Sequence, residues 1–156
     1  MDKFVLVLAA ALCFSTSAYA DVTCRTDING NLNCFGYDQD GNYVNTTAHK
    51  DINGHIHTTG RVGNNSIDTT SSKDINGNIN TTGSYGNSRV NTTSHKDING
   101  FVNTTGQVGD SRINTTASKD INGNINTSGH VGKRRINTTS HKDSFGATTI
   151  SGSIGK

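Results

Sequence analysis

The stretch KDINGNINTTGSYGNSRVNTTSH, residues 73–95, is followed directly by KDINGFVNTTGQVGDSRINTTAS, residues 96–118. The two stretches have the same length and nearly the same order of residues, and related stretches fill most of the chain. Such a fixed period predicts a repeat architecture in which every unit supplies the same local structure. We place the units at 26–49, 50–72, 73–95, 96–118 and 119–141.

Two kinds of turn divide each unit. The first, Asp-Ile-Asn-Gly, has its Asp, Asn and Gly where a type I turn followed by a left-handed glycine requires them. The second begins with Gly and reads Gly-Asn-Ser-Arg in unit 73–95. About eight residues lie between turns, enough for one strand each. The first turn is carried by Asp74, Gly77, Asp97, Gly100, Asp120 and Gly123, among others.

Side-chain alternation predicts which residues of the strands face inward. A period of two places alternate residues on the same face of a strand. One expected strand turns Ile79, Thr81, Gly83 and Tyr85 inward, and the next one turns Val90, Thr92 and Ser94 inward. We expect Tyr85 to lie opposite Val90 across the second turn. The interior is therefore thin, with one or two aliphatic residues in each strand.

This pattern predicts an all-β repeat protein of about five 23-residue strand-turn-strand units. We expect a β-solenoid, because near-identical units stack like residue on like residue; the alternative is an antiparallel β-meander. In the solenoid, a ladder of stacked amides and hydroxyls would contain Asn80, Thr82, Asn91, Thr93, Asn103, Thr105, Asn114 and Thr116.

The two ends of the chain depart from the repeat. Residues 1–20 combine Lys3, a short apolar run and Ala18-Tyr19-Ala20, the pattern of a cleaved signal peptide. The repeat domain is then 21–141, and residues 142–156 form a degenerate C-terminal cap. We expect the protein to be secreted or on the cell surface, with the periplasm as the other compartment, and to have no membrane span in its mature chain.

Two cysteines remain after the expected cleavage, Cys24 and Cys34. The turn between them, Asp27 to Gly30, pairs Arg25 with Asn33 and therefore sets the two cysteines directly opposite each other. An exported protein meets an oxidising environment, in which such a pair forms a disulfide. We predict a disulfide bond that closes the first hairpin.

Composition and motifs give little support to an enzymatic, metal-binding or nucleic-acid-binding function. The net charge is only +2, Glu is absent, and no phosphate-cradling loop or catalytic set stands outside the repeats. We therefore predict no enzymatic activity, no cofactor, no bound metal and no nucleic-acid partner. His49, His95 and His141 recur every 46 residues, and in a stacked solenoid they would lie too far apart to share an ion.

The stretch NSRVNTTSHKDING, residues 87–100, resembles the repeat of the bacterial curlin family, the subunits of extracellular amyloid fibres. Curlin subunits also have about five imperfect units, a Gly-Asn-Ser turn that enters a strand, a second polar turn and a signal peptide. Thr82 and Thr93 stand where curlin repeats carry Gln. The resemblance implies self-association into fibres, an outer-membrane secretion channel and a surface nucleator as partners.

Two functions follow as hypotheses. The first is an exported structural protein that self-assembles, as an amyloid-like surface fibre (fimbrium) or a subunit for biofilm or cell adhesion, because sheet edges are templates for another molecule. The second is a binding module whose polar Thr and Asn face holds ice, carbohydrate or another surface ligand.

Overall fold

The computed structural model describes residues 21–38 and 41–155. These residues form only strands and turns, so none of them belongs to a helix that could cross a membrane. The expected signal peptide, residues 1–20, lies outside the described residues. The strands are β1 (Asp21–Thr26), β2 (Leu32–Tyr37), β3 (Tyr43–Lys50), β4 (Ile56–Val62), β5 (Asn65–Lys73), β6 (Ile79–Tyr85), β7 (Ser88–Lys96), β8 (Val102–Val108), β9 (Ser111–Lys119), β10 (Ile125–Val131), β11 (Arg134–Lys142) and β12 (Thr148–Ile154).

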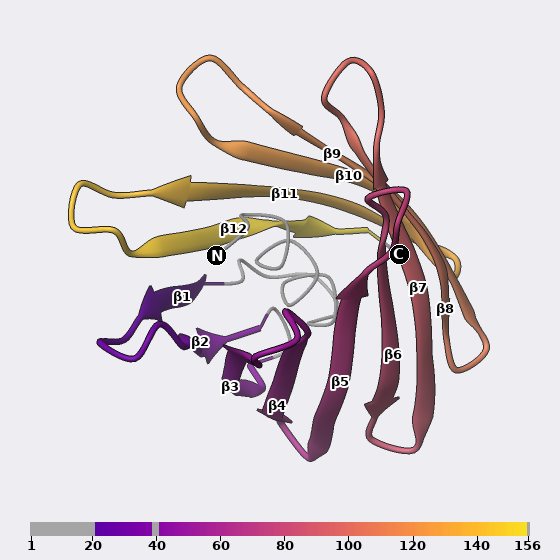
Figure 1. Cartoon of the computed structure of the whole chain (residues 1–156), viewed down its shortest axis with the longest axis horizontal. Helices are drawn as coiled ribbons and strands as arrows, with labels where there is room; N and C mark the ends of the chain where they lie inside the picture. Colours follow the sequence, from indigo (N-terminus) through magenta and orange to yellow (C-terminus); the bar gives the residue numbers. More distant parts are fainter. Residues whose placement is uncertain (1–20, 39–40, 156) are drawn as a thin grey trace.

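The strands form one closed antiparallel barrel in which neighbours follow each other along the chain and β1 pairs with β12. Figure 1 shows the chain running once around the barrel, with the indigo β1 next to the yellow β12. The all-β prediction with repeated strand-turn-strand units is confirmed. The predicted β-solenoid is wrong, and the strand order is that of a meander closed upon itself.

The tight turns explain why the units do not stack as a solenoid. A hairpin turn of two or three residues joins strands that hydrogen-bond to each other, so it cannot serve as the corner between two separate sheets. Antiparallel pairing also places the Asn of one strand opposite the Thr of the next, as in Asn80 with Thr93 and Thr82 with Asn91. Near-identical hairpins are therefore complementary neighbours in a meander.

The Asp-Ile-Asn-Gly turn has the predicted geometry. In unit 73–95, Gly77 N donates to Asp74 O at 3.0 Å, and Asp74 N donates to Asn78 O at 2.8 Å. The carboxylate Oδ1 of Asp74 accepts the backbone N–H groups of Asn76 and Asn78, each at 2.9 Å. Gly77 has a φ of 86°, which favours glycine. The turns at Asp97–Gly100 and Asp120–Gly123 repeat these backbone bonds.

The second turn differs from the prediction in its register. Tyr85 lies opposite Ser88, and Gly83 lies opposite Val90, so the expected pairing of Tyr85 with Val90 is wrong by two residues. The turn contains only Gly86 and Asn87, and Gly86 has a φ of 55°. A two-residue turn with a left-handed first residue matches the twist of the flanking strands, so it is preferred to the longer turn that we expected.

The predicted alternation is confirmed in β7, where Val90, Thr92 and Ser94 are all buried. In β6 it holds in part, since Thr81 is buried but Gly83 is exposed. The buried face lines the inside of the barrel, and it mixes aliphatic residues with hydroxyls. The hydroxyls pair with each other there: Ser71 Oγ lies 2.7 Å from Thr81 Oγ1. Bonds of this kind between neighbouring strands satisfy several of the buried hydroxyls.

The aliphatic part of the interior is divided between two clusters. The larger one lies on β1 to β5 and β12 and contains Val22, Cys24, Leu32, Cys34, Val44, Ala48, Val62, Ile67 and Ile150. The smaller one, Ile113, Val131 and Ile136, lies on β9 to β11. Residues 142–156, expected as a cap, contain β12, which pairs with both β11 and β1 and thereby joins the two ends of the repeat.

Candidate functional site

The first hairpin holds the predicted disulfide. Cys24 and Cys34 are Cα partners on β1 and β2, and their sulfur atoms are bonded. Arg25 lies opposite Asn33, as the turn prediction requires. Both cysteines are buried in the larger cluster, so the bond closes the hairpin at the seam between the first and last strands.

The eight predicted ladder residues all lie on the outer wall of the barrel. They do not form a column of identical residues: each Asn has a Thr partner, for example Asn103 with Thr116, and only Thr93 and Thr105 among them pair like with like. The wall therefore presents alternating amide and hydroxyl groups over several strands. The members are Asn80, Thr82, Asn91, Thr93, Asn103, Thr105, Asn114 and Thr116.

A three-residue relay crosses the outer wall beside each Asp-Ile-Asn-Gly turn. In unit 73–95, Thr93 Oγ1 donates to Asn80 Oδ1 at 2.8 Å, and Asn80 Nδ2 donates to Asp74 Oδ2 at 3.4 Å. The relay recurs as Thr47–Asn33–Asp27, Thr116–Asn103–Asp97 and Thr139–Asn126–Asp120. It ties each turn to a neighbouring strand, so it stabilises the rim of the barrel.

Hydrogen bonding lowers the pKa of four turn carboxylates, those of Asp27, Asp51, Asp74 and Asp120. For Asp74 and Asp120 the largest cause is the bond from the side chain of Asn78 or Asn124, which outweighs the opposing effect of burial. The pKa of Asp51 is also lowered; burial is the largest single influence and raises it, but the bonds from His57 and from two backbone N–H groups outweigh burial together.

A shallow hollow of about 550 Å³ lies on the outer wall around Gly106. It is lined by polar groups of β7, β8 and β9: Asn91, Thr93, Thr105, Gln107, Arg112 and Asn114. Amides, hydroxyls and one guanidinium there offer both donors and acceptors. Four of these residues belong to the predicted ladder, so the structure gathers them around one concave surface.

An aromatic patch interrupts the polar wall on β2 and β3. Its members are Phe35, Tyr37 and Tyr43, which are 42%, 59% and 50% exposed. The rings of Tyr37 and Tyr43 meet edge to face, with centroids 5.4 Å apart. The register of the repeat places Thr82, Ser84 and Arg89 at the equivalent positions of unit 73–95. The patch is thus a departure of the first unit from the repeat.

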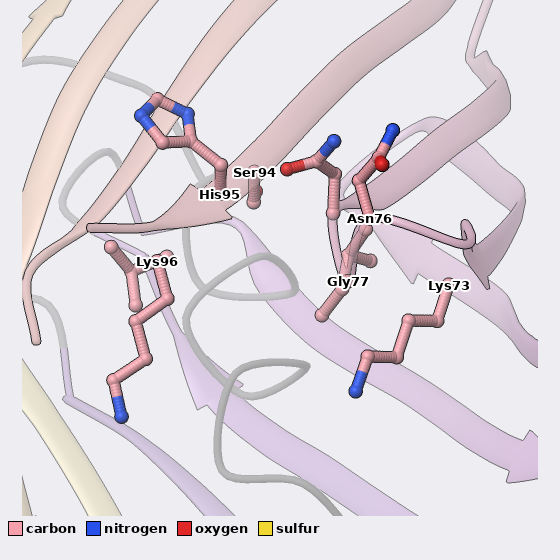
Figure 2. A pocket seen from close by; sticks show the side chains of 9 residues that line it. Lys73, Asn76, Gly77, Ser94, His95 and Lys96 are labelled. Atoms are coloured by element: carbon pink, nitrogen blue, oxygen red, sulfur yellow. The ribbon is translucent and has the colours of Figure 1, made fainter. Parts of the chain in front are cut away.

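One rim of the barrel carries an apolar crown and a set of lysines. The crown consists of the residues at the tips of the Asp turns, all at least 95% exposed: Ile28, Ile52, Ile75, Ile98, Ile121 and Phe145. A lysine ends the strand before most of these turns. Figure 2 shows Lys73 and Lys96 beside a pocket of about 300 Å³ between two neighbouring turns, which Asn76 and Gly77 also line.

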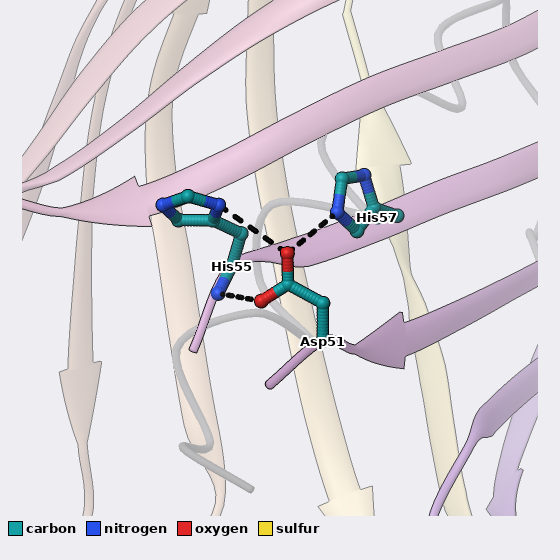
Figure 3. Close-up of side chains that lie close together, drawn as sticks. All are labelled: Asp51, His55 and His57. Carbon is teal, nitrogen blue, oxygen red and sulfur yellow. Dashed lines mark hydrogen bonds and ion pairs between the residues drawn. The ribbon is translucent and has the colours of Figure 1, made fainter. Parts of the chain in front are cut away.

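In the relay of unit 50–72 a histidine, His57, takes the place of the asparagine, and Figure 3 shows it with Asp51 and His55. His55 and His57 stand where the other units carry residues such as Asn78 and Asn80. The Nδ1 atom of His55 lies 3.4 Å from Asp51 Oδ2, and Nε2 of His57 lies 3.2 Å from the same oxygen. One carboxylate oxygen therefore faces two imidazole nitrogens.

The sequence-based reasoning missed this cluster because it followed the regular His series. His49, His95 and His141 lie on β3, β7 and β11 and do not converge. The informative pattern was the change from Asn-x-Asn to His-x-His in a single unit, since a departure from a repeat is not required by its fold. His49 does contribute, because its ring stacks on that of His57 with the centroids 5.2 Å apart.

Comparison with known proteins adds no family to this description. No protein-family model, no curated protein and no solved structure matches the chain.

Proposed function

We propose that the protein is an exported binding module that holds carbohydrate polymers on the outer wall of its barrel. The observation that carries the proposal is the aromatic patch of Phe35, Tyr37 and Tyr43, whose exposed rings replace the polar residues of the other units. Exposed aromatic side chains on an otherwise polar surface mark a site of interaction. Sugar rings have faces rich in C–H groups that stack on such rings.

The surroundings of the patch supply the polar contacts that a sugar needs. Phe35 is the Cα partner of Thr23 on β1 and of Asn45 on β3, and Arg61 follows Asn45 across the sheet. Ligand sites commonly combine aromatic surface with a few polar groups that fix orientation. The amides and hydroxyls of the adjacent strands would contact further sugar residues of a long polymer.

The closed barrel favours binding of a ligand on the outer wall over growth of a fibre by addition of molecules at sheet edges. Each described strand has two hydrogen-bonded neighbours, so no described strand offers a complete unpaired edge to a second molecule. Ice binding is less suited to this surface, since Thr81 points inward and Thr82 outward and the wall is curved.

The test is binding to a panel of immobilised polysaccharides, followed by variants that restore the repeat. F35T/Y37S replaces two rings by the residues of unit 73–95 and should weaken binding at least tenfold. The matched control is F101N, which removes another exposed ring, 41% exposed, at a position where other units have Asn. Equal binding by F35T/Y37S and the parent protein, or no binding to any polysaccharide, would refute the proposal.

A second candidate function, self-assembly into a surface fibre, is favoured by the barrel seam. β1 and β12 share only three residue pairs, whereas β1 and β2 share six. Opening of this short seam would expose two strand edges that could pair with another copy. Fibres that bind an amyloid dye at rising protein concentration would support this candidate, and a monomer at every concentration would contradict it.

A further inference from the structure

We propose that Asp51, His55 and His57 bind a divalent transition-metal ion, in the first place Zn²⁺. The three side chains offer one carboxylate oxygen and two imidazole nitrogens, all within 4.8 Å of one another. Two histidines and one carboxylate are a common protein ligand set for zinc, which leaves the fourth position of the tetrahedron for water. The side chains of His55, His57 and Asp51 are 44%, 33% and 27% exposed, so both the ion and the water can enter.

The distances suit a shared ion. Ligands that lie 2.0–2.1 Å from a tetrahedral ion are separated from each other by about 3.3 Å. Asp51 Oδ2 lies 3.4 Å from His55 Nδ1 and 3.2 Å from His57 Nε2. The three donors therefore need only small side-chain rotations to reach one ion.

Neighbouring groups hold two of the ligands in place. The other carboxylate oxygen of Asp51, Oδ1, accepts the backbone N–H groups of Asn53 and His55 at 2.9 Å, so Oδ2 is the oxygen that faces the rings. On His57, Nδ1 lies 3.1 Å from Thr70 Oγ1. When Nε2 binds metal, Nδ1 carries the proton and donates it to this hydroxyl, which is the usual support of a ligating histidine.

The other units of the chain form an internal comparison. They have the same turn carboxylate and the same threonine. In units such as 73–95, two Asn side chains direct N–H donors at the carboxylate and cannot bind a cation through them, and unit 96–118 has Phe101 in place of the first Asn. Only in unit 50–72 are both donors replaced by groups with a lone pair on nitrogen. The turn aspartate and the threonine are the same in these units, and only the two side chains beside the carboxylate differ.

The experiment is a Zn²⁺ titration of the purified chain without a histidine tag, in competition with a chromophoric chelator. The parent protein should bind one Zn²⁺ per chain at micromolar concentration or below. H55N/H57N restores the sequence of the other units, keeps the turn intact and should lose the site, with at least a hundredfold weaker binding. N78H/N80H should create a second site and raise the stoichiometry from one to two.

A positioning role of Thr70 gives an additional readout. T70V should weaken Zn²⁺ binding by roughly tenfold to a hundredfold, whereas T93V, the same change in unit 73–95, should leave the affinity unchanged. Parent protein that binds no stoichiometric Zn²⁺, or H55N/H57N protein that binds as the parent does, would overturn the proposal.

Discussion

Replacing Gly106 by Ala should destabilise the barrel far more than replacing the turn glycine of the same unit. A Cβ atom on Gly106 would lie 2.2 Å from the carbonyl oxygen of Asn91 and 2.6 Å from Cα of Thr92, both on the neighbouring strand β7. The φ of Gly106 is 148°, which L-residues rarely adopt. Backbone strain of about 1–3 kcal/mol and overpacking of about 1–3 kcal/mol together predict a loss near 4 kcal/mol.

The matched control is G100A in the preceding turn. Gly100 also has a positive φ, 86°, but a Cβ there would meet only the flexible end of Lys96, at 3.7 Å. This variant should lose only the backbone term, about 1–2 kcal/mol. Urea unfolding measures both: at a slope of about 2 kcal/mol/M the midpoint should fall by about 2 M for G106A and by less than 1 M for G100A. Equal losses in the two variants would refute the close-packing argument.

Three further predictions concern the turns, the interior and the disulfide. Hydrogen bonds lower the folded-state pKa of Asp74 and Asp120 below the ordinary 3.8. The two ionised carboxylates therefore stabilise the folded chain fully above that pH, and this contribution is lost as the pH falls through the lower folded values. A urea midpoint that stayed constant from about pH 5 to pH 2 would contradict this. Thr92 Oγ1 is buried and has no hydrogen-bond partner among the described residues. T92V should therefore raise the free energy of unfolding by about 1 kcal/mol, and a loss of stability would show that the hydroxyl is satisfied. Reduction of the bond between Cys24 and Cys34, which are 10 residues apart, should lower the free energy of unfolding by about 3 kcal/mol in the same assay, and an unchanged midpoint would contradict the constraint.

The local structure could be predicted from the sequence because short-range chemistry determines it. The Asp and Gly of each turn define the first hairpin register, and this register in turn places Cys24 opposite Cys34. Alternation then gives the inward face, as in Ile67, Thr69 and Ser71. These inferences depend on residues less than about a dozen positions apart, where turn geometry leaves few choices.

The global arrangement could not be predicted in the same way, since a stack and a meander satisfy the same alternation. The choice depends on how the sheet coils, and one glycine in each even-numbered strand contributes to that coiling by allowing the close approach seen at Gly106. From the alternation alone, the equivalent Gly83 was predicted only to be a small inward residue. The Gly-Asn turn was predicted to be longer than two residues, whereas the observed two-residue turn makes a tight hairpin that cannot form the corner between two sheets of a solenoid.

The candidate sites were missed for a related reason. A repeat directs attention to what its units share, whereas Phe35, Tyr37, His55 and His57 are places where one unit departs from the others. The fold requires the same residues in each unit, so such departures are the positions at which we look for a binding function.

The central claim is that the repeats close into a barrel within one chain, which makes the outer wall the functional surface. An isotope-filtered nuclear Overhauser experiment on a mixture of labelled and unlabelled protein tests this most directly at the seam. The account predicts contacts between Thr23 and Thr149, which are Cα partners on β1 and β12, within single molecules. Contacts between β1 and β12 that arise only between different molecules, or no such contacts, would contradict it.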